Sequence, residues 1–198
     1  MGNRLEGKTV AILATDGFEA AELFKPLEAL KQEGATVEIV SPKRGEIQGF
    51  RHFTPDKKAS VNKTLDQADA GDYDALVLPG GAHNPDQLRI NARALEFVRS
   101  FADDGRPIGA ICHAPWILIN AGLANGRTLT SWPTIRQDLK NAGANVVDKE
   151  VVVDSALVTS RGPDDLPAFC AKLIEEFSEG KHSEQANKAH RSEQRAGM

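Results

Sequence analysis

A short apolar run that passes into a helix at a cysteine is the feature that most limits what this chain can fold into. Residues 108–111 are continuously apolar, which predicts a buried strand, and a helical pattern begins at Pro115. With Cys112 between them, the sequence predicts a nucleophile elbow, a turn so tight that the residues two positions before and after it must be small. Those two residues are Ala110 and Ala114.

The predicted elbow suggests a chemical role for the sulfur. It would lie at the carboxyl end of a strand and beside a helix N-terminus, where the helix dipole favours the thiolate and lowers the thiol pKa. The alternative is a buried structural cysteine, which most lone cysteines are. We predict that Cys112 is a nucleophile.

Composition and charge limit the class of protein. The net charge of −4 leaves no basic surface for nucleic acid, and two cysteines in 198 residues suit a reducing cytosol better than a disulfide framework. No apolar run approaches the ~18 residues of a membrane span. We therefore expect a cytoplasmic protein with one domain at 8–178, an N-terminal extension at 1–7 and a disordered tail at 179–198.

Strands and helices are predicted to alternate along most of the chain. This alternation favours a three-layer α/β/α sandwich around a mostly parallel sheet. Glycines, prolines and polar residues between 42 and 63 predict short antiparallel strands or a hairpin. The predicted strands are 9–14, 36–40, 74–78, 108–111, 127–130, 146–147, 151–153 and 157–160, and the predicted helices are 18–33, a short one within 65–73, 91–104, 115–121, 134–141 and 167–177.

Three predicted strand ends carry residues suited to chemistry, and such ends meet at one edge of a parallel sheet. Gly80-Gly81 follows one strand, and glycine lets backbone amides approach a ligand closely. The amides of Gly81 and His113 are candidates for an oxyanion hole. Glu19 is a candidate for a protonated carboxyl that donates to the Cys112 sulfur. Its place in a first helical turn also explains Glu19 without any function, and Glu22 is equally available.

His113 is the candidate general base because it adjoins the nucleophile in sequence. A base of this kind needs a carboxylate to orient it, and Asp86 is the candidate; as an isolated residue, Asp86 also fits a helix N-cap. The histidines show no paired metal-ligand spacing, and no nucleotide-binding glycine motif occurs. We therefore expect no metal and no cofactor.

At these residues the chain resembles the PfpI-type family of the class I glutamine amidotransferase-like superfamily. That family includes bacterial general-stress proteins, intracellular cysteine peptidases and enzymes of the glyoxalase III or deglycase type. The resemblance covers roughly residues 8–177. It rests on DGFE at 16–19, LPGG at 78–81, AICHAP at 110–115, NAGA at 141–144, EVVVD at 150–154 and TSRGPDDLPAF at 159–169.

The resemblance implies a flavodoxin-like sandwich and a definite set of site residues. Cys112 would be the nucleophile with His113 as its partner, Glu19 would contact the sulfur, and the amides of Gly81 and His113 would form the oxyanion hole. Asp86 occupies the position of an acidic residue that a neighbouring subunit supplies, so the complete site would require a homo-oligomer, at least a dimer. The late histidine and glutamate of the amidotransferase relatives have no counterpart, which disfavours glutaminase activity.

Three functions remain open at this point. The first is a stress-response cysteine hydrolase that acts on reactive carbonyls, such as methylglyoxal and early glycation adducts. The second is an intracellular cysteine peptidase with a Cys112, His113 and Asp86 triad. The third is a sensor or chaperone without enzymatic activity, in which Cys112 is oxidised to a sulfinate. A reactive thiolate would serve all three.

Overall fold

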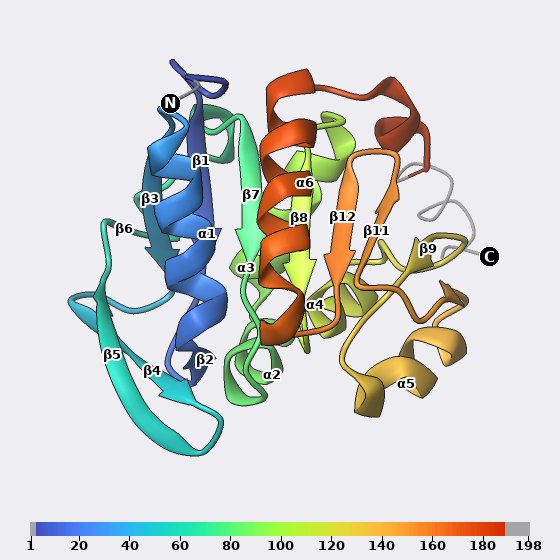
Figure 1. Cartoon of the computed structure of the whole chain (residues 1–198), viewed down its shortest axis with the longest axis horizontal. Helices are drawn as coiled ribbons and strands as arrows, with labels where there is room; N and C mark the ends of the chain where they lie inside the picture. Colours follow the sequence, from blue (N-terminus) through green and yellow to red (C-terminus); the bar gives the residue numbers. More distant parts are fainter. Residues whose placement is uncertain (1–2, 189–198) are drawn as a thin grey trace.

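The computed structural model describes residues 3–188, and it forms one central sheet with helices on both faces (Figure 1). Within these residues the sheet has seven strands, and all neighbouring pairs are parallel except the β11–β12 pair at one edge. This confirms the predicted α/β class and its mostly parallel sheet. In spatial order the strands are β11 (Val151–Asp154), β12 (Leu157–Ser160), β8 (Ile108–Ile111), β7 (Ala75–Leu78), β1 (Thr9–Leu13), β3 (Thr36–Ser41) and β6 (Lys63–Thr64).

Each face of the sheet has its own apolar core. Side chains of β1 alternate between the faces, so that Val10 and Ile12 join one core and Ala11 and Leu13 join the other. All four are fully buried, as expected for a strand covered on both sides. The two cores make this a three-layer sandwich.

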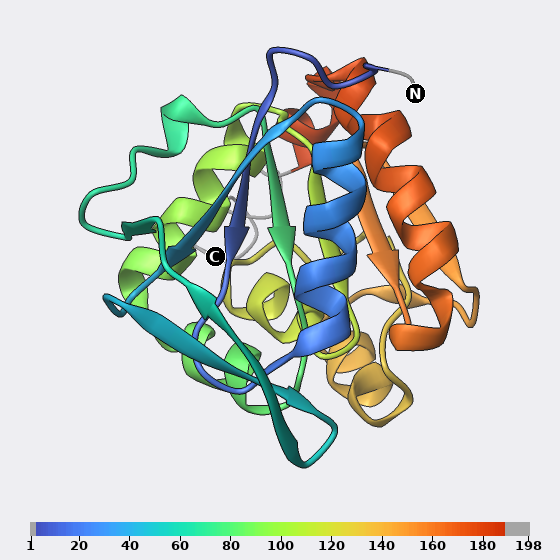
Figure 2. The same cartoon turned by 60° about the vertical axis from the view of Figure 1, so that its left-hand side comes forward.

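Helices from different parts of the chain form the two outer layers. Figure 1 and Figure 2 show α1 and α6 side by side over one face, while α3 and α4 cover the other. The helices are α1 (Ala20–Gln32), α2 (His83–Leu88), α3 (Ala92–Asp103), α4 (Pro115–Asn120), α5 (Arg136–Asn141) and α6 (Leu166–Glu179), with 3-10 turns η1 (Ala70–Asp72), η2 (Pro133–Ile135) and η3 (Pro163–Asp165).

A hairpin projects from the body of the molecule, as predicted within 42–63. It consists of the antiparallel strands β4 (Glu46–Arg51) and β5 (Thr54–Ser60), and the short strand β2 (Phe18–Glu19) lies parallel to β4 (Figure 2). Residues 18–19 are therefore strand, where the sequence predicts the first turn of a helix. Their backbone pairs with Gly49 and Phe50 of the hairpin, a partner that local periodicity does not reveal.

Smaller elements differ from the prediction in detail. The helix expected within 65–73 is only the turn η1, capped by the Asp69 side chain. Helix α2 was not predicted. Thr134, the expected N-cap of a helix to Asn141, lies inside η2 and makes no capping hydrogen bond to α5. A separate two-stranded parallel sheet pairs β9 (Thr128–Leu129) with β10 (Asn145–Val146).

The segment after α6 is folded, although the sequence predicts disorder from residue 179. The His182 amide donates to the Gly105 carbonyl at 2.8 Å, and the buried Gln185 side chain donates to the Arg106 carbonyl. The His182 backbone amide and the Gln185 side chain thus bond to the turn before β8, and these contacts order a segment whose low hydrophobicity predicts disorder.

The N-terminal residues also belong to the body of the fold. Leu5, inside the extension expected at 1–7, is fully buried, and its amide donates to the Glu33 carbonyl at 2.9 Å. The rest of the expected tail, 189–198, lies outside the described residues, as do residues 1–2. No helix formed by residues 3–188 is both long enough and apolar enough to cross a membrane.

Candidate active site

The turn between β8 and α4 has the geometry of a nucleophile elbow. Cys112 has a φ of 64°, in the left-handed region that non-glycine residues rarely adopt. The neighbouring chain holds it there: the Cys112 amide donates to the Ser160 carbonyl at 3.0 Å, and the Trp132 amide donates to the Cys112 carbonyl at 2.9 Å. Ala110 and Ala114 are fully buried, so larger residues would not fit the turn.

The His113 ring lies beside the sulfur. Its Nδ1 is 3.1 Å from Cys112 Sγ, and its Nε2 is 3.4 Å from the Thr134 hydroxyl oxygen. Trp132 stacks on the ring with centroids 6.0 Å apart. Burial lowers the pKa of His113, which favours the neutral imidazole that accepts a proton. The structure thus brings the predicted nucleophile and base into contact.

Glu22 is the carboxyl group at the sulfur. It is fully buried, its Oε2 accepts the Gly80 amide at 2.9 Å, and its carboxyl adjoins the Cys112 thiol, whose pKa it raises. Burial, together with the charge of Glu19, raises the pKa of Glu22 to about 8. A carboxyl with this pKa is mostly protonated at neutral pH, so it is able to donate a hydrogen bond to a thiolate.

Glu19, the residue predicted for that role, contacts the hairpin instead. Its Oε2 accepts the backbone amide of His52 at 2.9 Å. Glu19 is the last residue of β2, where its extended backbone follows the pairing with β4, whereas Glu22 lies in the first turn of α1 and faces the sheet edge. Both glutamates were candidates from the sequence, and their different secondary structures decide which one reaches the sulfur.

The backbone amides predicted for an oxyanion hole lie at the sulfur. The Gly81 and His113 N–H groups both lie close enough to the Cys112 sulfur to lower the pKa of its thiol. Gly80 allows the close approach, because a Cβ on it would lie 2.6 Å from the Cys112 Cβ and 2.6 Å from Glu22 Oε2. The buried Asn84 side chain donates to the Gly80 carbonyl at 3.2 Å and so helps to hold this turn.

The thiol itself differs from the expectation of a lowered pKa. Burial raises the pKa of Cys112, the adjacent Glu22 carboxyl raises it further, and the Gly81 and His113 amides lower it. With an exposed fraction of 6%, the side chain has lost the solvent that would stabilise a thiolate. At neutral pH Cys112 and Glu22 therefore both keep their protons until a substrate or His113 takes the thiol proton.

Asp86 does not meet His113 within this chain. It lies on α2 with an exposed side chain, neither as an N-cap nor in a described hydrogen bond to the imidazole. Thr134 contacts His113 Nε2 in its place. The sequence contains no local signal for Thr134, because its position by the ring depends on the path of the chain between β9 and α5.

Trp132 connects the site to a cavity of about 290 Å³. Arg136 and Arg161 line this cavity, and both donate to the Asp148 carboxylate. Trp132 both lines this cavity and stacks on the His113 ring, whereas Cys112 and His113 themselves do not line it.

The groups gathered here are a thiol, an imidazole and a carboxyl, which together suit nucleophilic addition and proton transfer. The one group of metal-binding type whose ligand atoms lie close together within residues 3–188 is elsewhere, in the last turn of α6 and just beyond it: Glu176, Glu179 and His182.

Comparisons with known proteins identify relatives along nearly the same stretch. A sequence profile of the DJ-1/PfpI family matches residues 8–176. A deglycase of Thermococcus kodakarensis is 45% identical over 165 residues, which cover 83% of this chain and 96% of that protein. General stress protein 18 of Bacillus subtilis is 43% identical over 164 residues, 82% of this chain and 94% of that protein.

The fold is also that of a solved relative. The crystal structure of DJ-1beta from Drosophila melanogaster is similar to this one with a TM-score of 0.79 and 29% sequence identity. The match covers 93% of this chain and 96% of the other.

Proposed function

The chain belongs to the DJ-1/PfpI family, and on that basis we propose that it is a cysteine hydrolase acting on small reactive carbonyls. Its substrates would be 2-oxoaldehydes such as methylglyoxal and the early adducts they form with amino groups. One observation carries the proposal: a strained, nearly buried cysteine has an imidazole nitrogen 3.1 Å away and two amides on its sulfur. Its 6% exposure favours a small substrate over a polypeptide.

The first step is addition of the sulfur to the aldehyde. A bond forms between Cys112 Sγ and the aldehyde carbon, while the thiol proton passes to His113 Nδ1. The π electron pair of the carbonyl moves to its oxygen, and the Gly81 and His113 amides stabilise the resulting charge. One such donor typically contributes about 3 kcal/mol to the transition state.

The next steps need no external oxidant. His113 returns the thiol proton to the charged oxygen, which gives a hemithioacetal and restores the neutral imidazole. His113 then moves a proton from the former aldehyde carbon to the neighbouring carbon, so that the first carbon is oxidised to a thioester and the second is reduced to an alcohol. Water then cleaves the thioester, which releases lactate and restores the thiol. Methylglyoxal and one water thus give one lactic acid. In an amine adduct, an aminocarbinol, the C–N bond breaks first as the hydroxyl proton is transferred to the nitrogen, which releases the free amine and gives the aldehyde that enters the same sequence.

Glu22 would stabilise the Cys112 sulfur as a thiolate during the reaction. Since burial raises the pKa of Glu22 to about 8, the neutral carboxyl can donate a hydrogen bond to sulfur as the thiol proton leaves. A charged carboxylate there would oppose the thiolate, so activity should depend on the protonated form.

A second copy of the chain would complete the site. Asp86 is exposed on α2, and a partner subunit could bring its own Asp86 to the His113 ring. The carboxylate would orient the imidazole and stabilise its protonated form, as orienting acids do in other nucleophile–histidine pairs.

Lactate formation from methylglyoxal tests the proposal directly. The wild-type chain and Cys170→Ala should both form lactate, because Cys170 lies on α6 and burial raises its pKa to about 11. Cys112→Ala should lose the activity by several orders of magnitude. Equal rates in wild type and Cys112→Ala would overturn the mechanism. Cleavage of a fluorogenic peptide that depends on Cys112, without lactate formation, would assign the site to a peptidase instead.

A further inference from the structure

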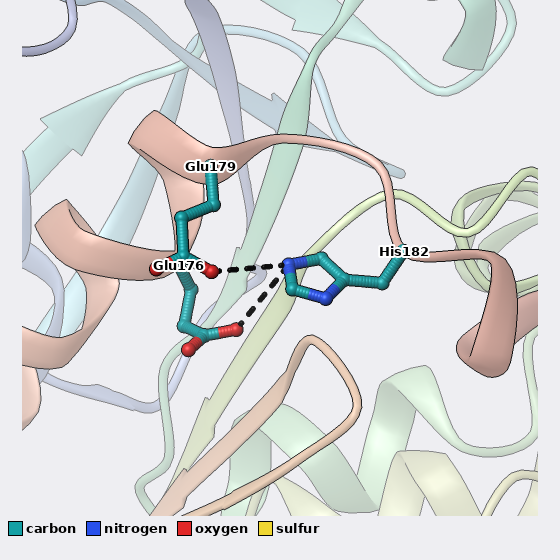
Figure 3. A group of neighbouring side chains, drawn as sticks. All are labelled: Glu176, Glu179 and His182. Atoms are coloured by element: carbon teal, nitrogen blue, oxygen red, sulfur yellow. Dashed lines mark ion pairs between the residues drawn. The ribbon is translucent and has the colours of Figure 1, made fainter.

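The last turn of α6 and the segment after it bring two carboxylates and an imidazole together. Glu176 Oε2 lies 3.7 Å from His182 Nε2, and Glu179 Oε2 lies 3.6 Å from the same nitrogen. Figure 3 shows both glutamates reaching toward the one ring nitrogen. The three ligand atoms all lie within 4.8 Å of one another.

Two of these atoms are buried without a hydrogen-bond partner among residues 3–188. They are Glu176 Oε2 and His182 Nε2, and Glu176 as a whole is only 7% exposed. Leaving such groups unsatisfied costs about 1–3 kcal/mol each, more for a charged group. Lys172, one turn earlier on α6, pairs with Glu175 at 2.6 Å, so its ammonium serves another carboxylate.

The spacing fits a bridging cation better than direct hydrogen bonds. A charge-assisted N–H···O bond would bring the heavy atoms to about 2.7–2.9 Å. A tetrahedral ion with bonds of about 2.0–2.1 Å holds two of its ligands about 3.3 Å apart, which is nearer to the observed separations. One nitrogen and two carboxylate oxygens also form a ligand set that suits Zn²⁺ and neighbouring divalent metals.

The surroundings favour positive charge as well. Both glutamates lie in the last turn of a 14-residue helix, where the dipole stabilises a cation. Two carboxylates would neutralise a dication, and water could fill a fourth position.

We propose that Glu176, Glu179 and His182 bind a divalent transition-metal ion of the Zn²⁺ class. The ion would fasten the C-terminal segment to α6. Because the His182 amide donates to the Gly105 carbonyl, the ion would also hold this segment over the turn that precedes β8.

The role of this site is structural. In Figure 1 the parallel strands run downward to the elbow, whereas the segment after α6 crosses the top of the sheet, so the ion would lie at the opposite end from Cys112. Glu179 and His182 also lie beyond residue 176, where the family match ends, so the site is independent of the function proposed for Cys112.

Zinc titration of the full chain tests the proposal. Metal-free protein in a Cys112→Ser, Cys170→Ser background, which removes thiol ligands, should bind one Zn²⁺ per chain by calorimetry. Glu176→Gln and His182→Asn should each weaken binding by more than about tenfold, since even the loss of outer-shell partners costs about 10–100-fold. His52→Asn and Glu28→Gln, which change an exposed histidine and an exposed glutamate, should bind like the parent.

Protection of Lys181 from trypsin gives a second readout that does not depend on affinity. Zn²⁺ should slow cleavage after Lys181 in the parent and leave it unchanged in Glu176→Gln. Circular dichroism of metal-free Glu176→Gln would show that the variant is folded. The proposal is overturned if the parent binds no zinc, or if folded Glu176→Gln and His182→Asn bind it as tightly as the parent.

Discussion

At the scale of single residues, burial determines the chemistry of the site. Glu22 and Cys112 are both removed from solvent, and burial raises the pKa of each. Both groups are protonated at neutral pH, and Cys112 lies beside His113, whose pKa burial lowers. The protonated Glu22 can stabilise a thiolate, and the neutral His113 can accept the thiol proton. Together they allow Cys112 to lose and regain a proton at neutral pH.

The raised pKa of Glu22 predicts a pH dependence of stability. Between about 4.5, the ordinary pKa of a glutamate, and about 8, the folded chain keeps a proton that the unfolded chain has released. The free energy of unfolding should therefore fall as pH rises through this window, by about 1.4 kcal/mol per unit of pKa difference. Urea unfolding at pH 5.5 and pH 8 measures the fall.

Glu22→Gln should remove most of that dependence, because glutamine does not titrate. Glu28→Gln, which changes an exposed glutamate on the same helix, should keep the wild-type dependence. An unchanged dependence in Glu22→Gln would show that another group is responsible.

At the scale of elements, the boundary between β2 and α1 gives two nearby glutamates different contacts. Glu19 ends β2 and holds the hairpin through the His52 amide, while Glu22, on α1, serves the sulfur. Asp16 also anchors the hairpin, since its carboxylate accepts the Gln48 amide at 2.8 Å. The segment 16–22 therefore joins the hairpin to the active site.

Glu19→Gln should loosen the hairpin with little effect on the thiol. A hydrogen bond to a charged group contributes about 1.5–3 kcal/mol, so amide hydrogen exchange at His52 should accelerate. Iodoacetamide alkylation of Cys112 should stay close to wild type in Glu19→Gln and change clearly in Glu22→Gln. Asp56→Asn, at an exposed hairpin position, serves as the control. The opposite ranking of the two glutamine variants in alkylation would restore Glu19 as the partner of the sulfur.

At the scale of the whole molecule, both ends of the sheet depend on residues distant in sequence. The C-terminal segment covers the end where the parallel strands begin, and Lys188 pairs with Asp154 in the β11–β12 turn. At the other end, the exposed Asp86 is the acid that we propose a second copy supplies.

A mixing experiment tests that proposal. Cys112→Ala and Asp86→Asn should each have little lactate-forming activity alone. In a dimer that combines them, the Asp86→Asn chain keeps its cysteine and receives Asp86 from its partner. Random reassortment makes half of the dimers mixed, each with one complete site, so activity should recover to about a quarter of wild type. No recovery after verified exchange of subunits would place Asp86 outside the partner's site.

The local pattern of the sequence was sufficient for the order of the elements and for the elbow. Apolar runs and helical periodicity depend on neighbours within a few residues, which is why β8, α3 and α4 were predicted nearly at their bounds. The small residues around Cys112 indicated its turn for the same reason. The convergence of the strand ends followed from the parallel sheet alone.

Only the tertiary structure decided which side chains meet there. Glu22 rather than Glu19 reaches the sulfur because β2 pairs with a hairpin some thirty residues away, and Thr134 reaches His113 through the path of a loop. The segment up to residue 188 folds because the His182 backbone amide and the Gln185 side chain bond to the backbone before β8. Contacts between residues far apart in the chain leave no periodic signal, so the sequence by itself determined the nucleophile and its turn, and the packing determined its partners.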